Sequence, residues 1–180
     1  MTFEILETSR LKLRKLTPEV FDFVFTNYTN EELKTFFGLS TEQELEKERI
    51  KHEKGLATYN KSFLYFQLID KSNDTVIGGC GYHTWYLDHF RAEIGYGLFQ
   101  EQHKGKGLMT EALLPIIDYG FNTMHLNRIE ALIGPENTAS LQLVKRLNFT
   151  REGYLRQHYN HNGQIVDSVL FSLLRSEYKG

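Results

Sequence analysis

The sequence predicts one α/β (α+β) domain whose mixed, mostly antiparallel sheet has seven strands flanked by helices. Short stretches with the pattern of strands recur along the 180 residues, and helical stretches separate only some of them. Three of these strands follow one another without an intervening helix, which argues against a doubly wound parallel sheet. The 41% hydrophobic content supports one packed core. We therefore expect a single domain over residues 1–180, with its core at about 8–176.

The first third of the chain is predicted to hold a strand and two helices. Residues 10–16 alternate leucine with basic side chains, as a half-buried strand does. Thr17 and Pro18 then begin a helix, because threonine caps helices and proline fits a first turn. The capping box Thr41-x-x-Glu44 begins a charged helix that reaches about Ala57.

The remaining elements follow from periodicity and from turn residues. Residues 71–74 join two strands into a hairpin, Asn137 is a helix N-cap, and Asn162-Gly163 is a hairpin turn. The predicted strands are 62–70, 75–82, 91–98, 128–134, 149–161 and 164–174, and the predicted helices are 108–122 and 137–147.

The strand at 91–98 leads through a glycine-rich basic loop into the helix that begins at Leu108. Unpaired N–H groups and the dipole at a helix N-terminus bind anions, and glycines let the backbone approach a phosphate closely. Lys104 and Lys106 add full positive charges. The spacing fits neither a P-loop nor a dinucleotide fingerprint. The loop is therefore either a surface turn or a site that holds another phosphate-bearing ligand mainly by backbone.

Composition excludes several classes of protein. The net charge of −2 argues against nucleic acid or a membrane surface as the main partner. Cys80 is the single cysteine and fits a small core residue in a reducing compartment, and we expect a cytoplasmic protein. His83, His89 and His103 lack metal-ligand spacing, so no metal is expected.

Eight short motifs occur in order along the chain: Glu93-Ile94-Gly95-Tyr96, Gly105-Lys106-Gly107, Thr110-Glu111-Ala112-Leu113, Arg128-Ile129-Glu130-Ala131, Asn137-x-x-Ser140, Leu147-x-Phe149, Glu152-Gly153 and Leu155-Arg156. They resemble the GNAT superfamily of acetyl-CoA-dependent N-acetyltransferases, closest to its RimJ/RimL branch, whose named members acetylate N-termini of ribosomal proteins. The resemblance covers about residues 8–176 and implies a GNAT-like fold, acetyl-CoA as co-substrate and direct attack by an amine in a ternary complex.

The resemblance implies where the co-substrate binds. The family's loop pattern fits either Gln102-x-x-Gly105-x-Gly107 literally or, anchored on the helix start, Lys104-x-x-Gly107-x-Met109. The second frame is preferred, because the helix start is the physical anchor. In both frames the pyrophosphate of coenzyme A meets the loop, and the pantetheine arm pairs with the strand edge near Leu98 and Phe99. Asn137 would bind that arm, and the loop residues are His103, Lys104, Gly105, Lys106, Gly107, Leu108 and Met109.

Two side chains are the candidate catalytic groups. A carboxylate such as Glu93 on a central strand is costly to bury unless it is hydrogen-bonded or functional. Burial would raise its pKa toward that of a useful base, and Glu93 would then act through a water. The alternative is an ion pair with Arg91 or Arg128. Many GNAT enzymes protonate the leaving thiolate with a tyrosine where this chain has Val144, so the resemblance implies Ser140 instead. Tyr82 and Tyr154 are the next candidates.

The acceptor is expected to be a protein N-terminus or a small amine. At pH 7 an α-amine is easier to deprotonate than a lysine by about 3.5 kcal/mol, which favours the N-terminus. No acidic cluster of the kind that would attract a polyamine is evident. His83, Trp85, Tyr154 and Arg156 are the candidate substrate contacts. A non-catalytic acetyl-CoA-binding module and an enzyme for small amines remain alternatives, and a monomer or homodimer is expected.

Overall fold

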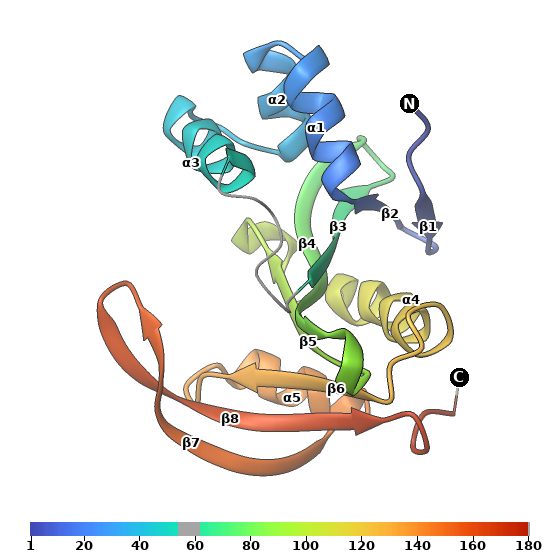
Figure 1. Ribbon diagram of the computed structural model, residues 1–180, viewed down its shortest axis with the longest axis vertical. Coiled ribbons are helices and arrows are strands. Elements are labelled where there is room, and N and C mark those ends of the chain that lie inside the picture. The colour runs from blue at the N-terminus through green and yellow to red at the C-terminus, as the bar shows by residue number, and fades with distance from the viewer. Residues whose placement is uncertain (54–61, 180) are drawn as a thin grey trace.

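The computed structural model describes residues 1–53 and 62–179 and shows one eight-stranded sheet with helices on both faces (Figure 1). The strands are β1 (Ile5–Glu7), β2 (Leu11–Leu16), β3 (Ser62–Asp70), β4 (Thr75–Tyr86), β5 (Arg91–Leu98), β6 (Arg128–Ile133), β7 (Thr150–His161) and β8 (Gln164–Leu174). The helices are α1 (Pro18–Asn27), α2 (Asn30–Phe37), α3 (Glu42–Glu53), α4 (Leu108–Asn122) and α5 (Thr138–Arg146), with short 3-10 turns η1 (Leu87–His89) and η2 (Glu101–His103).

The strand order across the sheet is β1-β2-β3-β4-β5-β6-β8-β7. Only β5 and β6 pair in parallel, and every other neighbouring pair of these strands is antiparallel. This confirms the predicted mixed, mostly antiparallel sheet. The eighth strand is the three-residue β1, which the sequence prediction omits.

Helix α2 was also missing from the prediction, although its signals are present in the sequence. Thr29 and Glu32 form a capping box in which each side chain bonds the other's backbone N–H, and Gly38 ends the helix in the left-handed conformation at φ 70°. Strand β4 extends beyond residue 82 to Tyr86. Residues 54–57, the predicted end of the charged helix, lie outside the described residues.

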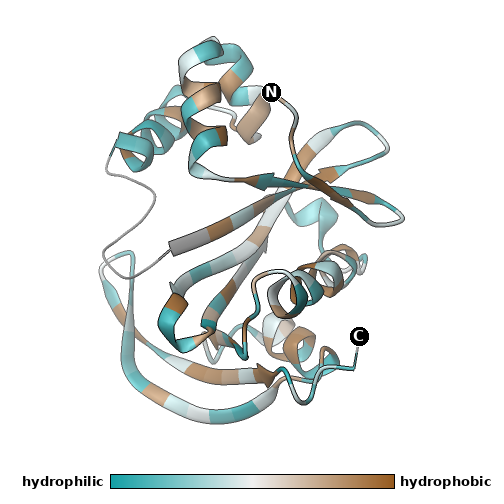
Figure 2. Ribbon diagram, turned by 45° about the vertical axis from the view of Figure 1, so that its right-hand side comes forward, coloured by the Kyte–Doolittle hydropathy of each residue, from teal (hydrophilic) through white to brown (hydrophobic). Residues whose placement is uncertain are grey.

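The two faces of the sheet carry different helices because successive side chains of a strand point to opposite sides. Phe66 packs its ring against Tyr119 of α4, whereas Gln67 donates a hydrogen bond to the Phe36 carbonyl at the end of α2 (2.7 Å). Figure 2 shows apolar residues along the central strands and on α4, whereas α3 is largely hydrophilic.

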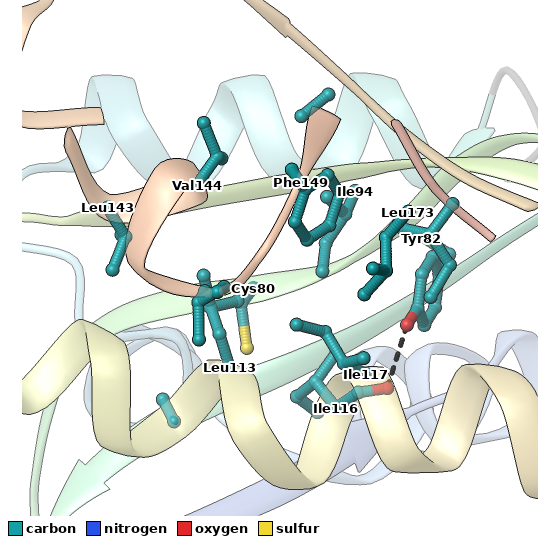
Figure 3. Packing of buried hydrophobic residues seen from close by; sticks show 14 of the residues in the cluster. Cys80, Tyr82, Ile94, Leu113, Ile116, Ile117, Leu143, Val144, Phe149 and Leu173 are labelled. Atoms are coloured by element: carbon teal, nitrogen blue, oxygen red, sulfur yellow. Dashed lines mark hydrogen bonds between the residues drawn. The ribbon is translucent and has the colours of Figure 1, made fainter. Parts of the chain in front are cut away.

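Helix α4 lies close against the sheet over the main core (Figure 3). The fully buried Tyr82 donates its hydroxyl to the Ile116 carbonyl at 2.7 Å. A Cβ at Gly120 would lie 2.3 Å from that hydroxyl oxygen, so only glycine allows this approach. Cys80 is buried in the same cluster, as predicted, and burial raises the pKa of its thiol.

The N-terminus of α4 is held to the start of β2 by Glu111. Its carboxylate accepts hydrogen bonds from Thr8 Oγ1 (2.6 Å), from the Arg10 backbone N–H (2.8 Å) and from Arg10 Nε (2.7 Å). Burial disfavours the charged form, but these bonds and one from Ser9 outweigh it and lower the pKa of Glu111 to about 2. The contacts fix where the preceding glycine loop sits.

Substituting Glu111 with glutamine is expected to destabilise the fold by about 1.5–3 kcal/mol, the contribution of hydrogen bonds to a charged group. Because the pKa of Glu111 is lower in the folded than in the unfolded protein, its carboxylate stabilises the fold at pH values above the unfolded pKa of 4.5. That stabilisation is lost as the pH falls toward about 2. Urea unfolding should therefore show a flatter pH dependence for Glu111→Gln between these values. Asp74→Asn, which removes an exposed pair with Lys12, should change stability by about 1 kcal/mol or less. Equal losses in both variants would contradict this role of Glu111.

Candidate active site

Strands β5 and β6 separate after their first three residues. Arg91–Glu93 pair with Arg128–Glu130, although β5 continues to Leu98 and β6 to Ile133. From Ile94 onward, the edge of β5 that faces β6 has no strand partner in the described register. Backbone N–H and C=O groups along such an edge require other partners, and an extended ligand supplies them.

Two clefts meet at this splay. The first, which we call the hairpin cleft, has a volume of about 820 Å³ and lies between the splay and the β7–β8 hairpin. The second, the loop cleft, has a volume of about 500 Å³ and lies between the end of β5, the glycine loop and α5. Tyr96, Asn137 and Ser140 line both clefts. Two ligands bound in the two clefts would therefore meet beside these three residues.

The loop cleft has the features of an anion site. Gly105 (φ 71°) and Gly107 (φ 74°) both adopt the left-handed conformation, and Gly107 is the N-cap of α4. N–H groups of the first turn of a helix have no acceptor within the helix. Lys104 and Arg146 add positive charge to the lining. These features favour a site for a phosphate-bearing ligand over a plain surface turn.

The lining of the loop cleft includes residues of both possible loop frames. The lining residues in this segment are His103, Lys104, Gly105, Gly107, Leu108, Met109 and Thr110. Lys106 instead offers its carbonyl to Arg10, and Gln102 donates its side-chain amide to Gln100. Gly105 and Gly107, the two glycines of the frame that begins at Gln102, line the cleft together with Lys104 and Met109 of the other frame, so the lining fits both frames.

Helix α5 presents its N-terminus to both clefts. The Asn137 side-chain oxygen accepts a hydrogen bond from the Ser140 backbone N–H at 3.1 Å, which is the predicted N-cap. This bond uses the oxygen of Asn137, so its amide N–H groups can still donate to a ligand. Val144, on the next turn, is buried in the core among Leu143 and Phe149 (Figure 3). No proton donor can therefore act from position 144.

Tyr96 is a site residue that sequence reasoning missed. Its hydroxyl is buried and has no hydrogen-bond partner of ordinary geometry among the described residues. Burial raises the pKa of the Tyr96 phenol, and the neighbouring Ser140 hydroxyl opposes that rise. Strand alternation from Glu93 places Tyr96 on the other face, but the sequence does not show that it borders two clefts.

Glu93 lies at the base of the hairpin cleft and is 9% exposed. The arginines that the sequence suggested as its ion-pair partners pair elsewhere. Arg91 Nη1 and Arg128 Nε each lie 2.7 Å from a carboxylate oxygen of Glu130. The imidazole of His83 lies beside Glu93, with its Nδ1 3.5 Å from Oε2 of Glu93.

The two catalytic candidates approach the splay from opposite faces of the sheet. Ala92 and Ile94 are buried in the main core beneath α4, so the alternate residue Glu93 points to the other face. Ser140 stands on α5, whose Leu143 and Val144 belong to that same core. An acceptor in the hairpin cleft and a donor in the loop cleft would thus meet across the splay.

The hairpin cleft is acidic, so the expectation of no acidic cluster was wrong. Its charged lining consists of the carboxylates of Glu93, Glu136 and Asp167, and no lysine or arginine appears among the described residues that line it. These carboxylates come from β5, from the segment before α5 and from β8. Their gathering depends on the tertiary fold, which the sequence pattern does not show.

The predicted substrate contacts divide into two groups. His83 and Tyr154 line the hairpin cleft, and the Tyr154 hydroxyl donates to Asp167 at 2.7 Å. That hydrogen bond is the main reason that the pKa of Tyr154 is raised. Trp85 packs against the main core instead, and Arg156 is exposed on β7 outside the lining of the cleft.

Two further predictions need correction. Phe99 does not border the loop cleft, although its neighbour Leu98 does. The Phe99 N–H donates to the Ile77 carbonyl (2.9 Å), and its side chain lines a separate cavity beside α1 and α3. Tyr82, a reserve candidate for protonating the thiolate, is enclosed in the core with its hydroxyl bonded to Ile116.

Residues 1–53 and 62–179 lack two further kinds of feature. There, no three His, Cys, Asp or Glu side chains gather in a way that would hold a metal ion. Within the same residues, none of the helices has the length and apolar character needed to span a membrane.

The chain is similar to several acetyltransferases. It matches the family described as acetyltransferase (GNAT) domain over residues 10–150. It is 38% identical over 179 residues, 98% of this chain and 99% of the relative, to the N-acetyltransferase p20 of Bacillus licheniformis. A solved GCN5-related N-acetyltransferase from Brucella melitensis superposes with a TM-score of 0.72 and 25% identity, covering 99% of this chain and 81% of that one.

Two relatives with named acceptors match shorter stretches. The ribosomal protein uS5-alanine N-acetyltransferase of Escherichia coli is 36% identical over 118 residues, 65% of this chain and 60% of the relative. The spermidine N(1)-acetyltransferase of Escherichia coli is 29% identical over 90 residues, 50% of this chain and 48% of the relative.

Proposed function

This chain belongs to the GNAT acetyltransferase family and is an N-acetyltransferase, and from that premise we propose that its acceptor is the N-terminal α-amine of a protein, such as a ribosomal protein. The family uses acetyl-CoA as co-substrate. The observation that carries the proposal is the meeting of the two clefts at the splay beside Tyr96, Asn137 and Ser140. That arrangement suits a ternary complex in which the amine attacks the thioester directly.

Acetyl-CoA fits the loop cleft in one direction. Its pyrophosphate would meet the backbone N–H groups from Gly105 to Met109 at the α4 N-terminus, with Lys104 and Arg146 nearby. Its pantetheine arm would pair with the open edge of β5, and the amide of Asn137 would hold it from α5. The thioester would then stand at the splay, between Glu93 on one side and Ser140 on the other.

The reaction needs three groups at that point. Glu93 is the general base for removal of the amine proton. It acts through an intervening group, because its carboxylate lies at the base of the cleft. Backbone N–H groups of the open β5 edge stabilise the oxyanion of the tetrahedral intermediate. The Ser140 hydroxyl protonates the departing thiolate, because position 144 offers only a buried valine.

Two arguments support a protein N-terminus as the acceptor. A free α-amine is easier to deprotonate at pH 7 than a lysine side chain by about 3.5 kcal/mol, which matters in a site with one carboxylate at the reacting centre. The partial similarity to the uS5-alanine N-acetyltransferase points to the same acceptor class and to the RimJ/RimL branch. Such an acceptor also fits the cytoplasm.

A small cationic amine is the second candidate acceptor. The carboxylates of Glu93, Glu136 and Asp167 would attract a polyamine into the hairpin cleft. The relative named for spermidine acetylation supports this alternative over half of the chain. A protein N-terminus is also cationic before it loses its proton, so the acidic lining is compatible with both acceptors.

A three-acceptor assay is expected to separate these candidates. The acceptors are a peptide with a free N-terminus and no lysine, an N-blocked peptide with one lysine, and spermidine. We expect the highest kcat/KM for the free N-terminus, measured as acetylated product by mass spectrometry. A higher kcat/KM for spermidine would replace the proposal by the polyamine reading, and faster acetylation of the blocked lysine peptide would overturn both.

A further inference from the structure

His83 faces Glu93 directly across two neighbouring strands. The register of β4 and β5 places the two residues opposite each other, on the face of the sheet away from α4. His83 Nδ1 lies 3.5 Å from Oε2 of Glu93 and 3.3 Å from Oγ1 of Thr84. Both oxygens are on the Nδ1 side of the ring, which favours the neutral tautomer that carries its proton on Nδ1. The lone pair then lies on Nε2.

The backbone around His83 is shaped to make room for its ring. A Cβ at Gly95 would lie 2.8 Å from His83 Nε2 and 2.9 Å from Cδ2, so glycine is required where the imidazole lies over β5. The β4–β5 register shifts just after His83, and Thr84 adopts φ 52°, which is rare for a β-branched residue. Bulges and strained residues of this kind are typical of positions that aim a functional side chain.

His83 is the outer member of the pair. Its side chain is 43% exposed, whereas that of Glu93 is 11% exposed, so an amine entering the hairpin cleft meets the imidazole first. Gly95, beneath Nε2, lines the cleft just beyond the point where β5 and β6 separate. The nitrogen that can accept a proton therefore lies beside the position proposed for the thioester.

The charged surroundings leave the imidazole able to accept a proton. Burial lowers the pKa of His83, so the ring is neutral and basic at pH 7. The other titratable groups that line the cleft are the carboxylates Glu93, Glu136 and Asp167 with Tyr96, Tyr154, Tyr159 and His161. Arg91 and Arg128, on the adjoining strands, are paired with Glu130.

We propose that His83 Nε2, rather than a water, takes the proton of the attacking amine, while Glu93 holds the Nδ1–H and stabilises the imidazolium. This inference rests on the proposed function. The neutral amine forms its bond to the thioester carbon as the C=O electron pair moves to oxygen. The ammonium proton of the intermediate passes to Nε2. The oxyanion pair then re-forms the C=O bond as the C–S bond breaks. Sulfur leaves with the C–S electron pair and takes a proton from Ser140, which regains one from solvent, and the His83 imidazolium releases its proton to solvent.

Substituting His83 with glutamine tests the proposal by kinetics. We expect His83→Gln to lower kcat by about 100-fold, the scale of one acid–base group, with little change in the KM for acetyl-CoA. The rise of the rate with pH that belongs to the imidazole should disappear, and added imidazole should restore part of the activity of His83→Ala. His89→Gln, an exposed histidine outside both clefts, is the matched control. Wild-type kcat, or a raised KM with an unchanged pH profile, would overturn the proposal.

A titration that does not depend on turnover tests the pairing itself. Glu93→Gln should lower the pKa of His83, because the variant removes a negative charge that favours imidazolium. NMR of the His83 Cε1–H over a range of pH measures this pKa. An unchanged His83 pKa would overturn the pairing. If the wild-type protein acetylates none of the amines offered, the proposed function fails. If it is active and His83→Gln is equally active, only the role of His83 fails.

Discussion

Replacing Glu93 with glutamine is expected to lower kcat about 100- to 10,000-fold and to leave the Kd of acetyl-CoA unchanged. The variant keeps the size of the side chain but removes the charge at the base of the hairpin cleft. Glutamine cannot stabilise an imidazolium at His83 or accept a proton itself. Acetyl-CoA binds in the other cleft under this account, so its affinity does not depend on position 93.

Steady-state kinetics over a range of pH, with calorimetry for acetyl-CoA, measure this effect. The alkaline rise of the rate should flatten in Glu93→Gln. Glu46→Gln, which removes one charge from the exposed face of α3, is the matched control and should behave as wild type. If Glu93→Gln lost acetyl-CoA affinity but kept kcat, Glu93 would belong to the donor site, and the assignment of the two clefts would be wrong.

Replacing Ser140 with alanine is expected to lower kcat by roughly 10- to 1000-fold if its hydroxyl protonates the thiolate. The substitution isolates the hydroxyl, because the helix cap uses the Ser140 backbone N–H, which alanine retains. Stability should therefore change little. Thr138→Ala removes an exposed hydroxyl from the same helix end and is the matched control.

A Ser140→Ala enzyme with wild-type turnover would contradict the role of Ser140. Tyr96 would then be the next residue to test as Tyr96→Phe, because its buried hydroxyl borders both clefts. Tyr82 is bonded to Ile116 inside the core, and Tyr154 is bonded to Asp167 on the hairpin. Rates measured with thioesters of different thiols separate the candidates. Loss of the true acid should slow the reaction most for the thioesters whose thiolates are the most basic.

Local signals in the sequence were sufficient for most of the sheet and for the anion loop. Alternation predicted β5, and periodicity predicted the bounds of α4, because each depends on near neighbours in the chain. Asn137 and the Asn162-Gly163 turn were recognisable for the same reason. Helix α2 has an equally local signal in its Thr29–Glu32 capping box, but the sequence prediction did not include this helix.

The site depends on contacts between distant segments, and there the sequence was less informative. Glu136 and Asp167 join Glu93 in one cleft only because β6 lies between β5 and β8. His83 was recognised as a possible substrate contact, but its pairing with Glu93 depends on the β4–β5 register. Trp85, Phe99 and Arg156 were placed near the site by chain proximity, and the bulge in β4 and the end of β5 direct the first two elsewhere.

A crystal structure with bound acetyl-CoA tests the central claim most directly, because that claim is geometric. We expect the pyrophosphate on the backbone from Gly105 to Met109, the pantetheine arm along the open edge of β5, and the thioester carbon between His83–Glu93 and Ser140. A thioester lying away from the junction of the two clefts, or a pyrophosphate bound elsewhere, would contradict the account.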